Sequence, residues 1–67
     1  MQVIVNGSAR IVAASSTDIA TLIGLLGLAG KRIAVECNGE IVPKSRYAET
    51  RVNAGDKLEI VAAVGGG

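Results

Sequence analysis

The sequence of 67 residues contains no histidine, tryptophan or phenylalanine, and only one tyrosine and one cysteine. Without histidine, the chain lacks the side chain that most often transfers protons near neutral pH. A single cysteine excludes a disulfide within the chain and is typical of a reducing compartment. The scarcity of aromatic residues and the absence of basic runs argue against a stacking platform for nucleic acid. Neither a catalytic domain nor a nucleic-acid-binding domain is expected.

The acidic side chains show no spacing typical of a metal site or of a catalytic pair of carboxylates. The six are Asp18, Glu36, Glu40, Glu49, Asp56 and Glu59, and seven basic residues bring the net charge to +1. We therefore expect no catalytic residue, no metal and no cofactor, so that the chain is not an enzyme. It is expected to serve enzymes as a substrate or as an adaptor.

Hydrophobic residues make up 49% of the chain and charged residues 19%, which predicts a single folded domain over residues 1–67. The longest apolar stretch, residues 19–29, is too short to span a bilayer and is interrupted by Thr21, Gly24 and Gly27. The start of the chain lacks the basic residues and apolar run of a signal peptide. These features predict a cytoplasmic protein that does not contact membranes.

A β-hairpin is predicted at the start of the chain, where Asn6-Gly7 separates residues 2–5 from residues 8–13. Both central positions of a type I′ turn require positive φ, which Asn-Gly tolerates. A two-residue loop pairs residue 5 with residue 8 and residue 3 with residue 10. This register divides the apolar side chains between two faces: Val3, Val5 and Val12 on one, and Ile4, Ala9 and Ile11 on the other.

One amphipathic helix is predicted to begin after residues 15–18, which offer several N-cap side chains. Its apolar stripe has the i, i+3, i+4, i+7 spacing and consists of Ile19, Leu22, Ile23 and Leu26. We expect the helix to end near Leu26, with Gly27 in the left-handed conformation that follows a helix cap. Gly30 is the alternative end.

A second hairpin is predicted from residues 33–38, which alternate apolar and polar side chains, through the turn Asn38-Gly39 to residues 40–42. Pro43 ends the second of these strands. Cys37 lies on the apolar face of the first strand, without a base to activate it. We interpret it as a small buried side chain and not as a nucleophile.

The last part of the chain is predicted to hold one more strand. Residues 44–52 are polar around Tyr47 and are expected to be irregular, with a helical turn and with Tyr47 covering the core. A turn at residues 53–56 leads to the strand of residues 57–64. Leu58 and Ile60 are expected to point inward.

The predicted order is therefore β-β-α-β-β-β. Two hairpins separated by a helix, with the last strand inserted between them, form the β-grasp arrangement. We expect an α+β domain with a mixed sheet of four to five strands and one helix that covers one face of the sheet.

Three glycines, Gly65, Gly66 and Gly67, directly follow the last predicted strand. Because glycine has no Cβ, such a tail can enter a narrow channel and lets a partner's backbone approach closely. A frayed end or an expression scar is the competing interpretation. We predict a flexible tail, mobile from about Ala63 onward, that is needed in the active sites of partner enzymes.

Strand parity also predicts an apolar patch on the sheet face that the helix leaves open. Its members are Ile4, Ile11, Val61 and Ala63. Scattered exposed aliphatic residues are ordinary on protein surfaces. The functional interpretation is that the patch leads toward the tail and docks the partner enzymes.

Several segments of this chain occur in an order and at a spacing that match a known family. They are residues 5–7, 22–23, 34–43, 47–50 and 55–61 and the final Gly66-Gly67. Over its whole length the chain resembles the ThiS family, the sulfur carriers of thiamine thiazole biosynthesis within the ubiquitin-like β-grasp group.

The resemblance implies that the functional group is the α-carboxylate of Gly67. A ThiF-like adenylyltransferase would convert this poor electrophile to an acyl adenylate with ATP. A persulfide sulfur, supplied by a donor such as a cysteine desulfurase, would displace AMP and give a thiocarboxylate. A thiazole synthase would then take the sulfur. ATP and its Mg²⁺ would belong to these partners.

Two alternatives remain open. Sulfur carriers for molybdopterin or for another thiolation pathway share the fold and the Gly-Gly end, although the short length and residues 38–43 favour the thiamine pathway. The other alternative is a non-catalytic ubiquitin-like interaction module, in which the tail is incidental.

Overall fold

The structure, a computed structural model, describes residues 1–63 of the chain. Its first two strands, β1 (Gln2–Val5) and β2 (Ser8–Ile11), form the predicted hairpin. Val5 pairs with Ser8, and the amide of Val12 donates to the carbonyl of Met1 at 2.8 Å. The predicted register is confirmed, and β2 ends two residues earlier than expected.

The helix α1 (Ile19–Leu25) begins and ends at recognisable caps. Asp18 is the N-cap, and its side chain accepts a hydrogen bond from the amide of Thr21 at 2.7 Å. At the other end Gly27 has a φ of 75°, and the amide of Leu28 donates to the carbonyl of Ile23 at 3.0 Å. This is the Schellman arrangement, which confirms Gly27 as the terminator of the helix.

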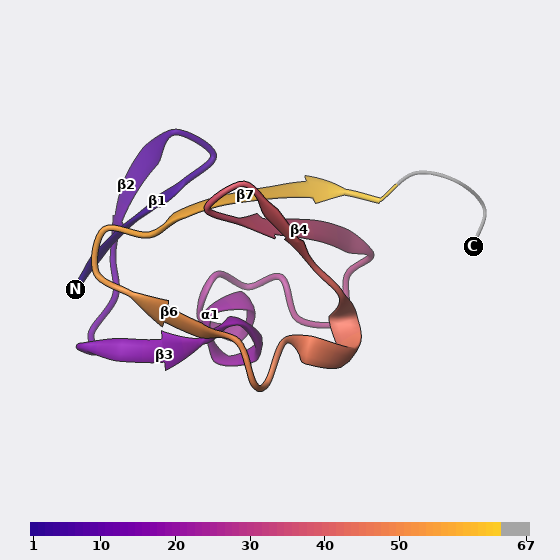
Figure 1. Ribbon diagram of the computed structural model, residues 1–67, viewed down its shortest axis with the longest axis horizontal. Helices are drawn as coiled ribbons and strands as arrows, with labels where there is room; N and C mark the ends of the chain where they lie inside the picture. Colours follow the sequence, from indigo (N-terminus) through magenta and orange to yellow (C-terminus); the bar gives the residue numbers. More distant parts are fainter. Residues whose placement is uncertain (64–67) are drawn as a thin grey trace.

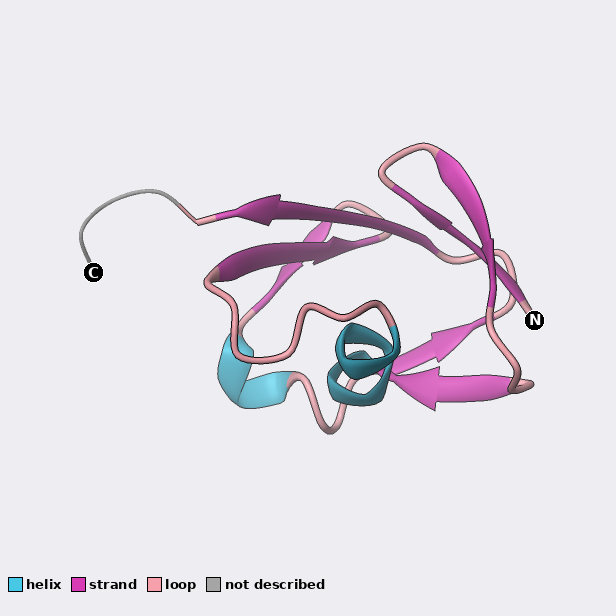
Figure 2. Ribbon diagram, turned by 180° about the vertical axis from the view of Figure 1, so that it is seen from behind, coloured by secondary structure: helices cyan, strands magenta, loops and turns pink. Residues whose placement is uncertain are grey.

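A five-stranded mixed sheet covers the helix, in the order β2-β1-β7-β4-β5. Its other strands are β4 (Ile33–Cys37), β5 (Glu40–Val42) and β7 (Lys57–Ala62). β7 pairs in parallel with β1 and antiparallel with β4, so the last strand lies between the two hairpins as predicted. Figures 1 and 2 show α1 beneath one face of this sheet. The β-grasp fold is confirmed.

A second, two-stranded sheet was not predicted. It consists of β3 (Ser16–Asp18) and β6 (Arg51–Asn53), in segments that the sequence indicated as helix cap and irregular chain. Each strand has three residues, too few to show a period of two, and they pair across more than 30 positions of the sequence. Thr17 and Val52 pair with each other and are both buried. The short 3₁₀ helix η1 (Lys44–Arg46) supplies the helical turn that was expected before β6.

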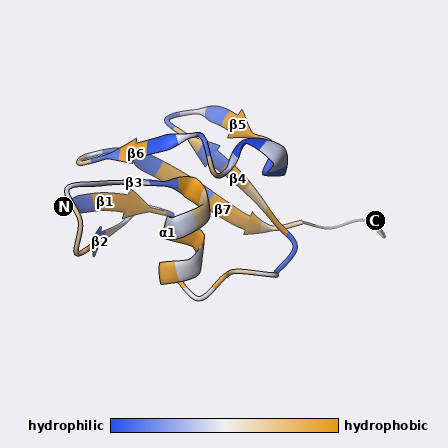
Figure 3. Cartoon of the chain, turned by 90° about the horizontal axis from the view of Figure 1, so that it is seen from below, coloured by the Kyte–Doolittle hydropathy of each residue, from blue (hydrophilic) through white to orange (hydrophobic). Residues whose placement is uncertain are grey.

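The core lies between the five-stranded sheet, α1 and the β3–β6 pair. Its six most deeply buried side chains are all aliphatic: Val3, Ile19, Leu22, Val35, Val52 and Leu58. Figure 3 shows the corresponding hydrophobic stretches in β1, β7 and α1. Tyr47 packs against this core from the side, as expected. No helix within residues 1–63 is long and apolar enough to cross a membrane.

Candidate functional site

The site of interest is the place where β7 ends and the tail begins. Ala62 pairs with Ile33 of β4, and the amide of Ala63 donates to the carbonyl of Arg32 at 3.0 Å. We call these four residues the tail base. The predicted tail residues Gly65, Gly66 and Gly67, and Val64 of the predicted strand, lie outside the described residues. Figure 1 shows β7 ending on the side of the molecule opposite the N-terminus.

Asn6 holds β7 just before the tail base. Its side-chain amide donates to the carbonyl of Ile60 at 2.9 Å and accepts from the amide of the same residue at 2.8 Å. β1 ends at Val5, so no strand residue on that side is left to bond Ile60. The Asn6 side chain takes the place of a strand residue and extends the parallel pairing toward the tail base. The sequence indicated Asn6 only as a turn residue.

Two grooves flank the tail base. The first, of about 520 Å³, lies between the α1–β4 loop, Tyr47 and Ala63. The second, of about 370 Å³, lies between the same loop and residues Val5, Asn6 and Ile60. Leu28 and Ile33 line both grooves and give them an apolar floor. The end of the central strand is therefore accessible from two sides.

The predicted docking residues lie on the open face, by which we mean the sheet face opposite α1, or at its margin. The side chains of Ile11 and Val61 are 78% and 59% exposed, Ala63 is exposed and Ile4 is half-buried. Ile4 is aligned with Lys57 of β7, so Val61 lies four residues, or about 13 Å, farther along that strand. The charged side chain of Glu59 stands between them on the same face.

The open face therefore carries two separate apolar areas. Ile4, Ala9 and Ile11 form one area on the first hairpin. Val61, aligned with Ala34 of β4, forms the other next to the tail base. The sequence predicted which side chains share this face, but not the charged residues that separate them. A role of these residues in docking stays a prediction, and Val61 and Ala63 lie closest to the tail.

Cys37 lies far along β4 from the tail base and is half-buried against the core. Desolvation raises the pKa of its thiol, and the carboxylates of Asp56 and Glu40 raise it further. The thiol therefore stays protonated near neutral pH, which makes it a poor nucleophile. This environment agrees with its interpretation as a small core-facing side chain.

Within residues 1–63, no three side chains of histidine, cysteine, aspartate or glutamate come together as metal ligands. The carboxylates Glu36 and Glu59 do face each other across β4 and β7, on the open face. They are separated from the tail base by the pair formed by Ala34 and Val61. Within the described residues, the candidate site is thus the end of a central strand that is bonded on both sides, and not a cluster of reactive side chains.

The sequence matches the ThiS family over residues 3–67. The chain belongs to this family. It is similar over its full length to the crystal structure of the ThiS thiamine biosynthesis protein of Geobacter metallireducens, with 33% identity and a TM-score of 0.89. The solution structure of a thiamine biosynthesis protein from the same organism gives 32% identity and a TM-score of 0.79, over the whole of this chain and 88% of that one.

Two curated relatives are longer than this ThiS family member. A protein named thiazole synthase, from Paramagnetospirillum magneticum, is 54% identical over all 67 residues, and the chain spans 20% of its length. The uncharacterized protein ycf40 of Porphyra purpurea is 39% identical over 46 residues, which is 69% of this chain and 65% of that protein. The family and its solved structures support the sulfur-carrier assignment in thiamine biosynthesis.

Proposed function

We propose that the chain carries sulfur for thiamine thiazole formation on the α-carboxylate of Gly67. A carboxylate oxygen attacks the α-phosphorus of ATP in a ThiF-like adenylyltransferase, and pyrophosphate leaves. A persulfide sulfur then attacks the acyl carbon and displaces AMP, and a thiol reductant cleaves the S–S bond to leave the thiocarboxylate. A thiazole synthase takes the sulfur from this group.

The position of β7 is the observation that supports this proposal most directly. The strand is central in the sheet, is bonded on both sides, and ends at an accessible edge, three residues before Gly65. A tail that enters an enzyme needs a rigid body behind it and no bulky side chains along it. The catalytic groups belong to the partners in this proposal, so the chain itself is not an enzyme.

The longer relative supports a thiazole synthase as a partner. In that protein, a segment similar to the whole of this chain belongs to a polypeptide named thiazole synthase. Segments that act on one another are often joined in one chain, because the linkage raises their effective concentration. The same name favours the thiamine pathway over the molybdopterin alternative. ATP-dependent activation and a single reduced cysteine fit the cytoplasm.

The test is the intact mass of the chain after incubation with a ThiF-type adenylyltransferase, MgATP, a cysteine desulfurase and cysteine. We expect a gain equal to the replacement of one oxygen by sulfur, localised to the C-terminal peptide. An unchanged mass, with the adenylyltransferase active on its own carrier, would contradict the proposal and favour a non-catalytic interaction module.

Removal of Gly67 is the matched control, because it shortens the tail without touching the described residues. The deletion should abolish the mass gain while the melting temperature stays the same. Cys37→Ala should keep the full mass gain, because the thiol is not the group that carries sulfur.

A further inference from the structure

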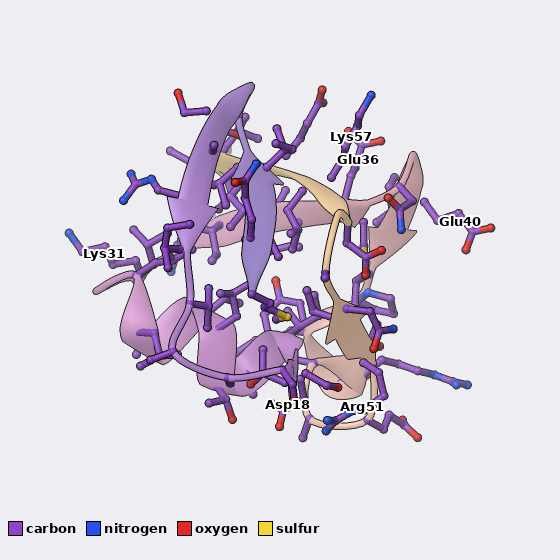
Figure 4. All side chains as sticks on the ribbon, turned by 90° about the vertical axis from the view of Figure 1, so that its left-hand side faces the viewer. Asp18, Lys31, Glu36, Glu40, Arg51 and Lys57 are labelled. Carbon is purple, nitrogen blue, oxygen red and sulfur yellow. The ribbon has the colours of Figure 1, made fainter. Side chains whose placement is uncertain are left out.

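Charge is distributed unevenly over the molecule. Four of the seven basic residues, Arg10, Lys31, Arg32 and Lys44, line the two grooves at the tail base, and none of the six acidic residues does. We call these four the cationic collar. Carboxylates gather instead at the far end of β7, where Glu36 and Glu59 line one hollow and Glu40 lines another. Figure 4 shows Lys31 on one side of the molecule and Glu36 and Glu40 on the other.

The four residues of the collar come from three separate parts of the fold. Arg10 is on β2, residues 31 and 32 end the α1–β4 loop, and Lys44 begins η1. Figure 3 shows the hydrophilic end of this loop close to the end of β7. All four side chains are exposed, and the ion pair that residues 1–63 contain, Arg46 with Glu49, lies outside the collar. Among the described residues, no acidic side chain forms an ion pair with the collar, which presents positive charge to solvent.

The collar surrounds the base of the tail and not its reactive end. Four residues separate Ala63 from the carboxylate of Gly67, a span of up to about 14 Å in an extended chain. When the carboxylate reaches ATP inside an enzyme, the collar is left at the mouth of the channel. Its contacts are then with the protein surface around that mouth.

We propose that the collar docks on an acidic rim around the tail channel of the adenylyltransferase; this rests on the proposed function. Positive charge around the tail attracts such a rim at long range and orients the tail before contact. Exposed charges of this kind act mainly on the association rate and are screened by salt. The apolar groove floors at Leu28 and Ile33 supply short-range contact once the rim is engaged.

The test compares two double variants that each remove two positive charges. Lys31→Gln with Arg32→Gln removes half of the collar. Arg46→Gln with Lys57→Gln removes the same charge at the acidic end, where Arg46 and Lys57 line hollows away from the tail. Association of each purified chain with a ThiF-type adenylyltransferase is followed by stopped flow at low and at high salt. Thermal unfolding confirms that both variants are folded.

We expect the collar variant to associate about tenfold more slowly than the wild type at low salt, within the range of electrostatic steering. The difference should vanish at high salt. The association rate of the control variant should stay within about twofold of the wild-type rate, because exposed charges far from the contact act weakly.

An equal fall in the association rate of both variants would mean that only the net charge matters, and would overturn the proposal that the collar docks on the adenylyltransferase. If the collar variant associates as fast as the wild type at low salt, and the wild type is adenylated normally, the docking role of the collar is overturned and the proposed function stands. A wild-type chain that is neither bound nor adenylated would overturn both.

Discussion

The two Asn-Gly turns share one backbone geometry but hold β7 in different ways. Asn6 and Asn38 have φ angles of 50° and 52°, and the glycines after them have φ angles of 82° and 85°. Asn6 uses both side-chain atoms on one residue, Ile60, near the tail base. Asn38 divides its bonds: it accepts from the amide of Lys57 at 3.0 Å and donates to the carboxylate of Asp56 at 3.2 Å.

Solvent exposure separates the two turns further. The Asn6 bonds are partly buried, whereas the Asn38 side-chain bonds are exposed to water. Both asparagines also have a backbone bond to β7: the amide of Asn6 donates to the carbonyl of Leu58 at 2.9 Å, and the amide of Asn38 donates to the carbonyl of Lys57 at 2.7 Å. The loss of a hydrogen bond costs more where water is excluded from the orphaned group. The same dipeptide therefore stabilises the tail end of β7 more than its beginning.

Asn6→Ala should give the largest loss in this comparison, about 3 kcal/mol of unfolding free energy. Alanine in the left-handed region costs about 1–2 kcal/mol, and each lost hydrogen bond costs about 1 kcal/mol. Urea unfolding monitored by circular dichroism measures this loss. Asn6→Gly is the control, since glycine keeps the φ angle and should recover about half of it. If Asn6→Ala unfolds at the same urea concentration as the wild type, the two hydrogen bonds between Asn6 and Ile60 contribute nothing to stability.

Asn38→Ala should cost less, about 2 kcal/mol, because the backbone penalty is the same but the lost side-chain bonds face water. The same urea experiment decides the order of the two variants. A loss equal to or greater than that of Asn6→Ala would break the comparison. It would mean that the bond to Asp56 matters more than exposure indicates.

The turns also show how far sequence reasoning extends in this fold. Asn-Gly predicts both hairpins because the turn needs positive φ at two adjacent positions, which is a local requirement. The side-chain bonds of Asn6 to Ile60 join residues 54 positions apart, and no local pattern indicates them. The β3–β6 pair was missed for the same reason. Local signals predicted the helix and its end at Gly27, whereas the contacts that depend on tertiary packing had to be observed.

The candidate site divides in the same way. The residues that share the open face could be predicted from strand parity, whereas the role of the glycine tail stays a prediction. The separation of Ile4 from Val61 could not be predicted, because it depends on the stagger of β7 against β1. The cationic collar was also missed, since its members are spread over 35 positions and meet only in the fold. Lys31 and Arg32, directly before the strand that pairs with the last one, were the available signal.

Cys37, next to the Asn38 turn, gives a prediction that probes the weaker of the two turns. Burial raises the pKa of its thiol above the ordinary value of cysteine, and the nearby carboxylates of Asp56 and Glu40 raise it further. Because the folded-state pKa is raised, the folded protein favours the protonated thiol. The contribution of this thiol to the free energy of unfolding is complete below the unfolded-state pKa and is lost as pH rises through the folded-state pKa. Alkylation by iodoacetamide at neutral pH should be severalfold slower than that of free cysteine. Asn38→Ala should speed the alkylation of Cys37 only if the turn opens. If Cys37 of the wild type reacts as fast as free cysteine, its thiol does not lie in a partly buried site.

Asp18 extends the comparison to a third short polar side chain that bonds the backbone, and it should show the smallest effect. Its carboxylate accepts from the amide and the hydroxyl of Thr21, at 2.7 and 3.0 Å. The hydrogen bond from the Thr21 amide is the main cause that lowers the pKa of Asp18. Since the folded-state pKa is depressed, the stabilisation is present above the unfolded-state pKa of about 3.9 and is lost as pH falls through the folded-state pKa.

Asp18→Asn tests this cap, because asparagine keeps an acceptor oxygen for the helix but cannot titrate. Near neutral pH, the melting temperature of the variant should lie within a few degrees of the wild-type value. Between pH 5 and pH 2, a window that brackets the titration of aspartate, the melting temperature of the variant should fall less than that of the wild type. If both proteins lose melting temperature in parallel over that range, the cap is not a source of acid sensitivity, and α1 is held by its buried face alone.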